Sequence, residues 1–292
     1  RPRPSRRSIP RRATDGSAQR SKRCAYRGGM VDADELLQLA EQIAREAGEL
    51  ARRRRDEGVR IAATKSALAD IVTEADREVE ALIRARLTAA RPADGFLGEE
   101  SGAERGESDV TWVVDPIDGT VNYAYGIPHY AVSIAAVTGE PDPEQWTAQA
   151  GAVFAPAIAE LFRAARGSGA WLGADRLAVS QATDAGALIA TGFGYDPATH
   201  AGDLERVRIV MPLARDLRRA GAASLDLAYV AAGRLDGYFE RGLHPWDHAA
   251  GALLVTEAGG RVGGAPGGRP GRQMTIAAGP DLYAALDTAI YR

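Results

Sequence analysis

A short apolar segment, residues 111–114, runs directly into the hexapeptide Asp115-Pro-Ile-Asp-Gly-Thr120. Aromatic and β-branched residues in a row are typical of a buried strand, so both aspartates belong at its carboxyl end. Two carboxylates three residues apart repel each other unless cations hold them. Pro116 stiffens the turn between them, and Gly119 lets the backbone approach another group closely. The fold must therefore bring cations to this strand end.

The hexapeptide has the chemistry of a site for a hard metal ion. The carboxylate oxygens of Asp115 and Asp118, with no nitrogen or sulfur beside them, favour Mg²⁺ or Mn²⁺. A helix that begins at Gly119 and Thr120 would point its N–H groups at the same place and could receive a phosphate. The structural alternative is that the aspartates make an Asx-turn and a helix cap. The acidic segment Gly98-Glu-Glu-Ser101 favours the metal site.

A further segment, His244-Pro-Trp-Asp-His-Ala-Ala-Gly251, places Asp247 in the first turn of an Ala- and Gly-rich helix. Its carboxylate could simply interact with the helix dipole, but the small residues behind it allow close packing against the hexapeptide. His244 and His248 lie on either side of Asp247, and the three residues superficially resemble a set of zinc ligands. We do not expect zinc, because Pro245 begins the helix after His244 and no Cys is near. The sequence contains no P-loop, no serine-hydrolase elbow and no complete dinucleotide-binding motif.

Charge is distributed unevenly along the 292 residues. Residues 1–29 hold ten basic residues and only Asp15, whereas residues 30–292 hold 26 basic and 38 acidic residues. An acidic body argues against nucleic-acid binding by the folded part. It would also repel a phosphorylated substrate, so binding such a substrate requires cations at the site. No apolar run reaches the roughly 18 residues of a membrane span. The single cysteine, Cys24, excludes a disulfide framework and a Cys-based zinc site, which fits a cytoplasmic protein.

Residues 1–29 are rich in Arg, Ser and Pro and lack hydrophobic periodicity. They contain no apolar stretch of the kind that a secretory signal peptide needs. Three interpretations remain: an organelle-type transit segment, a basic arm for nucleic acid, and sequence upstream of a start at Met30. We favour the third, because patterned sequence begins directly after Met30. We expect a disordered tail that takes no part in the chemistry.

The body alternates between helical and strand patterns. Periodicity and capping signals predict helices over residues 32–55, 73–90, 204–217, 223–232, 246–258 and 280–291. Strands are predicted over residues 111–114, 130–137, 151–154, 161–165, 188–191 and 236–240. Residues 263–271 are predicted to be a loop. We expect two closely packed α/β halves, residues 30–180 with the metal site and residues 181–292 completing it.

Four segments together resemble the inositol monophosphatase family, and the resemblance covers residues 31–290. They are Gly98–Ser101, the hexapeptide with Val121-Asn122, Trp246-Asp247 through residues 257–260, and Ala69-Asp-Ile-Val-Thr73-x-x-Asp76. The resemblance implies an αβαβα sandwich, dependence on two or three Mg²⁺ ions with Mn²⁺ as a substitute, lithium sensitivity and a homodimer.

The resemblance also implies roles for individual residues. Metal ligation is carried onto Glu99, Asp115, the Ile117 carbonyl, Asp118 and Asp247. Thr120 and Asp76 take the positions that activate water, although a capping box with Thr73 is the structural alternative for Asp76. The substrate is implied to contact Glu99, Ile117, Asp118, Gly119, Thr120, Gly221, Ala222, Ala223, Glu240 and Asp247. Of these, Gly119 and Thr120 offer amides to the phosphate, while Gly221–Ala223 and Glu240 line the alcohol.

Lys65 stands at the position of the family's mobile-loop lysine. It is the only lysine of the body, which holds 25 Arg. A composition this biased would be expected to replace a dispensable lysine by arginine, and an ammonium near the site differs chemically from a guanidinium. Chance survival of one lysine is the alternative.

We therefore predict a phosphomonoesterase that uses Mg²⁺-activated water on a polyol phosphate, with myo-inositol 1-phosphate as the first candidate. Fructose 1,6-bisphosphate, histidinol phosphate and 3′-phosphoadenosine 5′-phosphate are alternative substrates, although a carboxylate at Glu240 counts against bisphosphates. The alternative from another class is a non-enzymatic module that binds nucleic acid or protein through the basic tail. Neither a membrane nor nucleic acid is an expected partner of the body.

Overall fold

The computed structural model describes residues 32–59, 61–64, 71–140, 142–181 and 185–291, which belong to one compact unit, residues 32–292. The predicted disordered tail and Lys65 lie outside the described residues. None of the helices in the described ranges combines the length and the apolar character that spanning a membrane requires.

The helices of this unit are α1 (Ala33–Glu57), α2 (Glu74–Ala90), α3 (Thr120–Tyr125), α4 (His200–Val210), α5 (Ala223–Ala231), α6 (Pro245–Glu257) and α7 (Pro280–Tyr291). The large sheet has, in spatial order, β10 (Asp175–Arg176), β9 (Gly169–Leu172), β8 (Glu160–Ala165), β7 (Thr147–Ala155), β6 (Ala131–Thr138), β5 (Val110–Asp118), β3 (Gly95–Gly98) and β4 (Gly102–Glu104). The small sheet has β12 (Ala214–Arg218), β11 (Ala187–Thr191), β13 (Gly237–Glu240), β15 (Thr275–Ala278) and β14 (Arg261–Gly263). A separate ribbon pairs β1 (Ile61–Thr64) with β2 (Ile71–Thr73).

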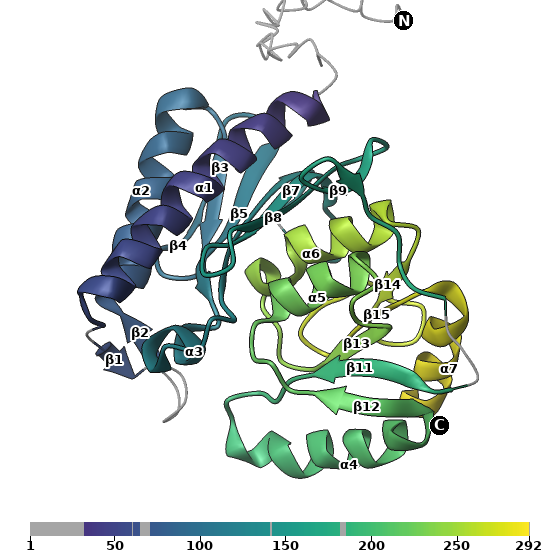
Figure 1. Cartoon of the computed structure of the whole chain (residues 1–292). Helices are drawn as coiled ribbons and strands as arrows, with labels where there is room; N and C mark the ends of the chain where they lie inside the picture. The colour runs from purple at the N-terminus through teal and green to yellow at the C-terminus, as the bar shows by residue number, and fades with distance from the viewer. Residues whose placement is uncertain (1–31, 60, 65–70, 141, 182–184, 292) are drawn as a thin grey trace, which may run out of the picture. The chain divides into compact units, whose positions relative to one another are not determined.

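These elements stack in the order αβαβα (Figure 1). Helices α1 and α2 cover one face of the eight-stranded sheet, and α5 and α6 cover its other face. The five-stranded sheet lies beyond α5 and α6, and α4 and α7 close the stack. The predicted αβαβα sandwich is therefore confirmed.

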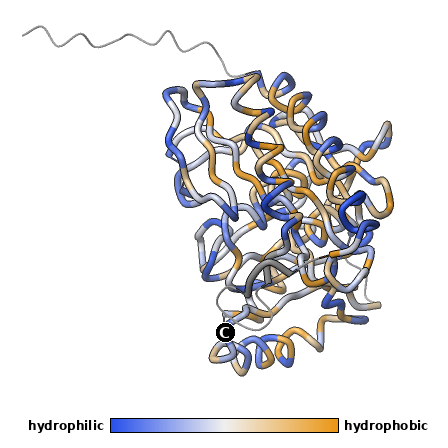
Figure 2. Tube along the Cα trace, turned by 90° about the vertical axis from the view of Figure 1, so that its left-hand side faces the viewer, coloured by the Kyte–Doolittle hydropathy of each residue, from blue (hydrophilic) through white to orange (hydrophobic). Residues whose placement is uncertain are grey.

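Local sequence explains the outer helices. α1 begins after Asp32, whose Oδ1 accepts the N–H groups of Asp34 at 3.0 Å and Glu35 at 3.3 Å. α2 begins after Thr73, which completes a capping box with Asp76. Hydrophilic and hydrophobic residues alternate along the helices (Figure 2), and α1 and α2 each bury one face against the large sheet.

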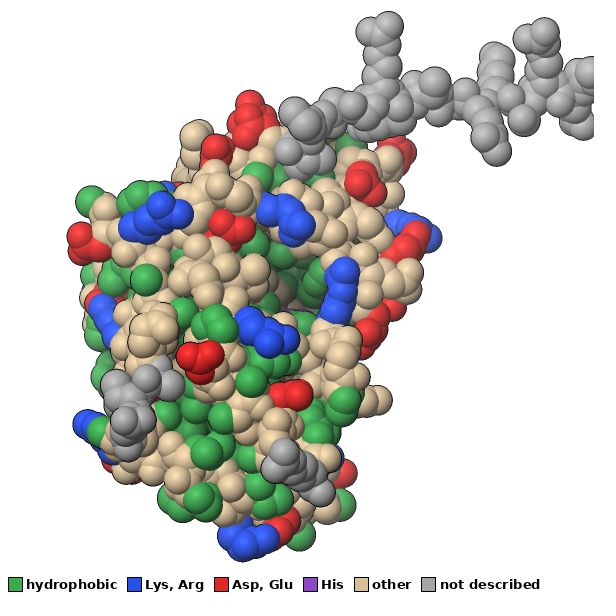
Figure 3. Space-filling model, turned by 90° about the vertical axis from the view of Figure 1, so that its right-hand side faces the viewer, with side chains coloured by type: hydrophobic (Ala, Val, Ile, Leu, Met, Phe, Trp, Pro, Cys, Tyr) green, Lys and Arg blue, Asp and Glu red, His purple; other side chains and the backbone are tan. Residues whose placement is uncertain are grey.

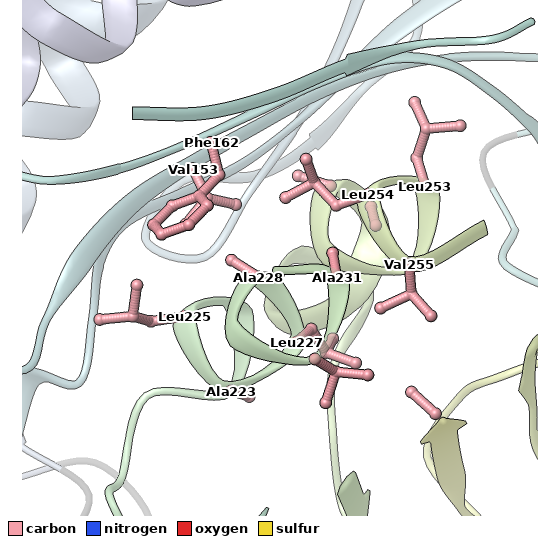
Figure 4. Packing of buried hydrophobic residues seen from close by; sticks show 14 of the residues in the cluster. Val153, Phe162, Ala223, Leu225, Leu227, Ala228, Ala231, Leu253, Leu254 and Val255 are labelled. Atoms are coloured by element: carbon pink, nitrogen blue, oxygen red, sulfur yellow. The ribbon is translucent and has the colours of Figure 1, made fainter. Parts of the chain in front are cut away.

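The main core lies between the large sheet and the pair α5 and α6, where Figure 4 shows Leu225, Phe162 and Leu254 among the packed side chains. Small residues let these layers approach closely. A Cβ at Gly251 would lie 2.6 Å from Leu227 Cβ, so α6 meets α5 at that point. The small residues behind Asp247 thus allow close packing, here against α5.

The predicted helix over residues 204–217 is wrong in its second half. α4 ends at Val210, a 3₁₀ turn spans Met211–Leu213, and β12 follows and pairs in parallel with β11. Pro212 has no N–H for the helical hydrogen bond and therefore stops the helix. The apolar residues beyond it pack onto the small sheet, which spacing along the sequence does not reveal.

Nine of the described strands have no predicted counterpart: β1, β2, β3, β4, β9, β10, β12, β14 and β15. All have five residues or fewer, and β12 falls in the segment predicted to be a helix. Conversely, the predicted strand 111–114 extends to Asp118. The chain changes from the large sheet to the small one between Arg176 and Ala187. We propose that the predicted division near residue 180 corresponds to this change of sheet.

Candidate active site

Both aspartates of the hexapeptide belong to β5. The strand pairs with β6 up to Asp115 and again at Asp118, and the register shift between these two positions is a bulge. Asp115 Oδ1 accepts the N–H of Ile117 at 3.1 Å, so the predicted Asx-type alternative describes one of its contacts. Gly119, with φ +88°, turns the chain, and α3 begins at Thr120 as expected.

Asp118 joins the hexapeptide to the first turn of α5. Its carboxylate accepts the N–H groups of Ala223 at 3.2 Å and Ser224 at 2.7 Å, and the Ser224 hydroxyl at 2.6 Å. Gly119 lies against the preceding loop, because a Cβ there would stand 3.1 Å from Ala222 Cβ. The fold thus brings the hexapeptide to the segment expected to line the alcohol. Ser224 had no signal in the sequence, because its partner is distant along the chain.

Asp76 serves two partners. Its Oδ2 accepts the N–H of Thr73 at 2.8 Å, so the capping box that we weighed as an alternative is present. Its Oδ1 lies 3.2 Å from Thr120 Oγ1, which also stands 3.1 Å from the Ile117 carbonyl. Burial raises the pKa of Asp76 to about 6. The two residues expected to activate water are therefore in contact.

Glu80 is a buried carboxylate that sequence reasoning missed. It accepts the N–H groups of Glu100 and Ser101, each at 2.8 Å. The preceding residue, Glu99, donates its N–H to the Val114 carbonyl at 3.2 Å. The acidic segment is therefore placed beside the end of β5 by both the sheet and α2.

Asp247 lies in the first turn of α6, where its Oδ2 accepts the N–H of His244 at 2.6 Å. His244 stacks on Trp246 with ring centroids 4.8 Å apart. His248 is buried on the inner face of α6, and neither of its ring nitrogens has a hydrogen-bond partner within the described part of the chain. The start of α6 therefore orients the Asp247 carboxylate, as its position in the first turn of the predicted helix suggested.

The carboxylates of the region influence one another. Burial raises the pKa of Asp115 well above its ordinary value, and the charges of Glu99, Asp118, Asp247 and Asp76 raise it further. Burial also raises the pKa of Asp118 to about 6, while burial, Asp118 and Glu99 raise that of Asp247. Carboxylates from four separate segments therefore share one region, and their mutual repulsion calls for a cation.

In their present orientations these side chains do not form a finished metal cage. Across the described residues, no three Asp, Glu, His or Cys side chains stand in a geometry that could hold one ion. Asp115, Asp118 and Asp247 each use an oxygen for an internal hydrogen bond. The donor set nevertheless fits Mg²⁺ or Mn²⁺, because it consists of carboxylate oxygens with one nearby backbone carbonyl.

Glu240 ends β13, and its Oε2 accepts the Tyr238 hydroxyl at 2.6 Å. Burial raises the pKa of Glu240 to about 7. The neighbouring Arg241 donates to Asp203 at 3.0 Å rather than to Glu240. Within the described residues no arginine forms an ion pair with Glu240, although Arg219 acts on it electrostatically.

Known proteins provide the decisive comparison. The model of the inositol monophosphatase family matches residues 32–290. This chain belongs to that family. The inositol-1-monophosphatase SuhB of Mycobacterium tuberculosis is 43% identical over 256 residues, which are 78% of this chain and 83% of that protein. The Nus factor SuhB of Escherichia coli strain K12 is 42% identical over 239 residues, which are 80% of this chain and 86% of that protein. The structure of extragenic suppressor protein suhB from Bartonella henselae has a TM-score of 0.80 and 38% identity, and covers 88% of this chain and 99% of its own.

As a member of the inositol monophosphatase family, the protein is a phosphoric monoester hydrolase. The family is generally metal-dependent. The resemblance carried by the four sequence segments is confirmed, and so is the predicted enzyme class.

Proposed function

We propose that the protein hydrolyses a polyol phosphate monoester, with myo-inositol 1-phosphate as the leading substrate, in a reaction that depends on Mg²⁺. The observation that carries this proposal is the meeting of Glu99, Asp115, Asp118 and Asp247 at the end of β5. There Glu99, Asp118 and Asp247 raise the pKa of Asp115, and Asp118 and Glu99 raise that of Asp247. Such a set of carboxylates is suited to cations and, through them, to an anionic substrate.

The metal ligands in this proposal are the four carboxylates and the Ile117 carbonyl, which would hold two or three Mg²⁺ ions or their Mn²⁺ substitutes. When bound, the ions would neutralise the phosphate, lower the pKa of the attacking water and compensate the charge of the leaving alkoxide. No covalent intermediate with the enzyme is needed.

The chain's own residues orient the reactants. Thr120 would hold the attacking water through its hydroxyl, and Asp76, 3.2 Å away, would hold that hydroxyl and take part in moving the proton. The backbone N–H groups of Gly119 and Thr120 would receive the phosphate at the turn into α3. Lys65 would be a further catalytic residue, with its ammonium group near the attacking water.

The alcohol would lie between the loop Gly221–Ala223 and Glu240. Asp118 and Glu240 can accept hydrogen bonds from several hydroxyls, which suits a polyol. A charged Glu240 would repel a second phosphate and so disfavours fructose 1,6-bisphosphate and 3′-phosphoadenosine 5′-phosphate; histidinol phosphate lacks hydroxyls to match it.

Turnover of a panel of phosphate monoesters with Mg²⁺ tests this proposal. We expect the highest kcat/KM for myo-inositol 1-phosphate, no turnover after chelation of the metal, and recovery when Mg²⁺ is restored. A higher kcat/KM for a bisphosphate or for histidinol phosphate would contradict the substrate assignment. Turnover that survives chelation would contradict the metal assignment.

A second candidate is a binding role, which the name of the 42% identical E. coli relative, Nus factor SuhB, favours because it names a factor rather than an enzyme. The face of the body in Figure 3 offers nucleic acid no extended basic patch, since basic and acidic side chains are interspersed on it. The basic tail would have to supply the contact. RNA binding that is equally weak with and without residues 1–29 would contradict this role.

Two further properties rest on family resemblance, and a third rests on the single cysteine, Cys24. We propose that the protein is inhibited by lithium, forms a homodimer and acts in the cytoplasm. Inhibition of Mg²⁺-dependent turnover by LiCl but not by NaCl, and the molar mass in solution, test the first two, while fractionation of cells tests the third.

A further inference from the structure

Glu80 is a buried carboxylate that the proposed reaction does not use. It is 3% exposed and lies on α2, one turn after Asp76. Its Oε2 accepts the N–H of Glu100 and its Oε1 accepts the N–H of Ser101, each at 2.8 Å. Within the described residues no basic side chain forms an ion pair with it, so backbone N–H groups satisfy its charge.

The turn held by Glu80 carries Glu99. The N–H of Glu99 donates to the Val114 carbonyl at 3.2 Å, directly before Asp115. Glu99 is therefore placed by β5 on one side and, through the next two residues, by Glu80 on the other. Gly98 is part of this arrangement, because a Cβ there would lie 2.5 Å from Glu80 Oε2.

α2 thus supports two parts of the site with two carboxylates one turn apart. Asp76 contacts Thr120 at 3.2 Å, and Glu80 holds the turn that carries Glu99. Four residues of helix separate the two positions by about 6 Å along a rigid axis. Because the helix is rigid, it fixes the position of the Glu99 turn relative to Thr120.

We propose that Glu80 is a positioning residue of the phosphatase, whose buried carboxylate presents Glu99 to the metal beside Thr120. This inference rests on the proposed function, in which Glu99 is a metal ligand. Groups that orient metal ligands through hydrogen bonds commonly contribute about 10- to 100-fold to metal affinity or activity.

Metal binding without substrate tests the proposal. Glu80→Gln keeps the side-chain volume but replaces one acceptor oxygen by an NH₂ group, which faces a backbone N–H. We expect its Kd for Mn²⁺, measured by electron paramagnetic resonance on the full chain, to rise about tenfold or more. The Mg²⁺ concentration for half-maximal turnover should rise in parallel.

Glu78→Gln is the matched control. Glu78 belongs to the same helix but pairs with Arg54 at the surface and does not touch the Glu99 turn. We expect its Mn²⁺ affinity to equal that of the wild type. Circular dichroism and a cooperative thermal transition establish that both variants are folded before affinity is compared.

Gly98→Ala provides a second variant, which retains the Glu80 carboxylate but shifts it. The new Cβ at position 98 would displace Glu80, so the Mn²⁺ affinity of this variant should fall. In the double variant with Glu80→Gln, the two losses of Mn²⁺ affinity should not add. Additive losses, or a folded Glu80→Gln chain with wild-type Mn²⁺ affinity, would overturn the positioning role. A different result would contradict the proposed function: a wild-type chain that binds Mn²⁺ but hydrolyses none of the phosphate monoesters in the panel.

Discussion

At the scale of single residues, Asp76 combines a capping role with a contact to Thr120. Its Oδ2 completes the capping box with Thr73, while its Oδ1 faces Thr120. Asp115 likewise accepts the N–H of Ile117 within an Asx-type turn. A carboxylate has two oxygens and can serve two partners, so a local motif that predicts a cap is no argument against a ligand.

We expect Asp115→Asn and Asp247→Asn each to lower Mg²⁺-dependent turnover by more than about 100-fold while the chain stays folded. An amide oxygen carries no full negative charge and is a poor ligand for a hard ion. Turnover at saturating Mg²⁺ measures the effect, and Asp109→Asn, at an exposed loop position, is the control. Wild-type turnover in the Asp115 or the Asp247 variant would contradict the assignment of that residue as a metal ligand.

Glu240→Ala should reduce kcat/KM for inositol 1-phosphate by about ten- to a hundredfold, the value of a lost charge-assisted hydrogen bond. Glycerol 2-phosphate should be affected much less, because it offers few hydroxyls at that distance. Steady-state kinetics with both substrates separates this role from a structural one. Equal losses would indicate that Glu240 only supports Tyr238 and the end of β13.

His248→Leu should stabilise the protein by about 1–2 kcal/mol, because burying a polar ring without a partner costs free energy. Both ring nitrogens of His248 are buried and unpaired among the described residues, and burial lowers its pKa to about 4. Urea denaturation at neutral pH measures the change. His248→Asn, which stays polar, should not stabilise, and a Leu variant less stable than wild type would show that the ring packs too well to replace.

At the scale of elements, the same substitution should have opposite effects on two helices. Gly251 faces Leu227, where a Cβ would stand 2.6 Å from Leu227 Cβ, so Gly251→Ala should destabilise the contact between α6 and α5 by about 1–3 kcal/mol. Gly202 is exposed on α4, and Gly202→Ala should stabilise by up to about 1 kcal/mol, since alanine favours helix. Thermal unfolding of both variants measures the difference. Equal shifts would mean that helix propensity outweighs packing at Gly251.

At the scale of the whole molecule, we expect removal of residues 1–29 to leave the melting temperature and the specific activity unchanged. The segment has almost no apolar residues with which to add to a core. Differential scanning calorimetry and turnover of the two chains measure this. A loss of several degrees or of activity would show that the tail docks on the body.

The sequence by itself determined the acidic segments, because each motif is local, and the resemblance that these segments carry implied the family and its αβαβα fold. The hexapeptide needs only its own residues to combine a strand end, a turn and two carboxylates. The same holds for the starts of α1, α2 and α6, where a capping side chain lies within three residues of the N–H groups that it accepts.

Only the tertiary structure decided which distant groups complete the site. Ser224 bonds Asp118 across 106 positions, and Glu80 holds the Glu99 turn from another helix. Residues 214–218 form β12 rather than a helix because β11 offers a strand edge beside them. Hydrogen bonds and packing between segments far apart in the chain leave no periodic trace in either segment, so the partners become visible only when the layers are assembled.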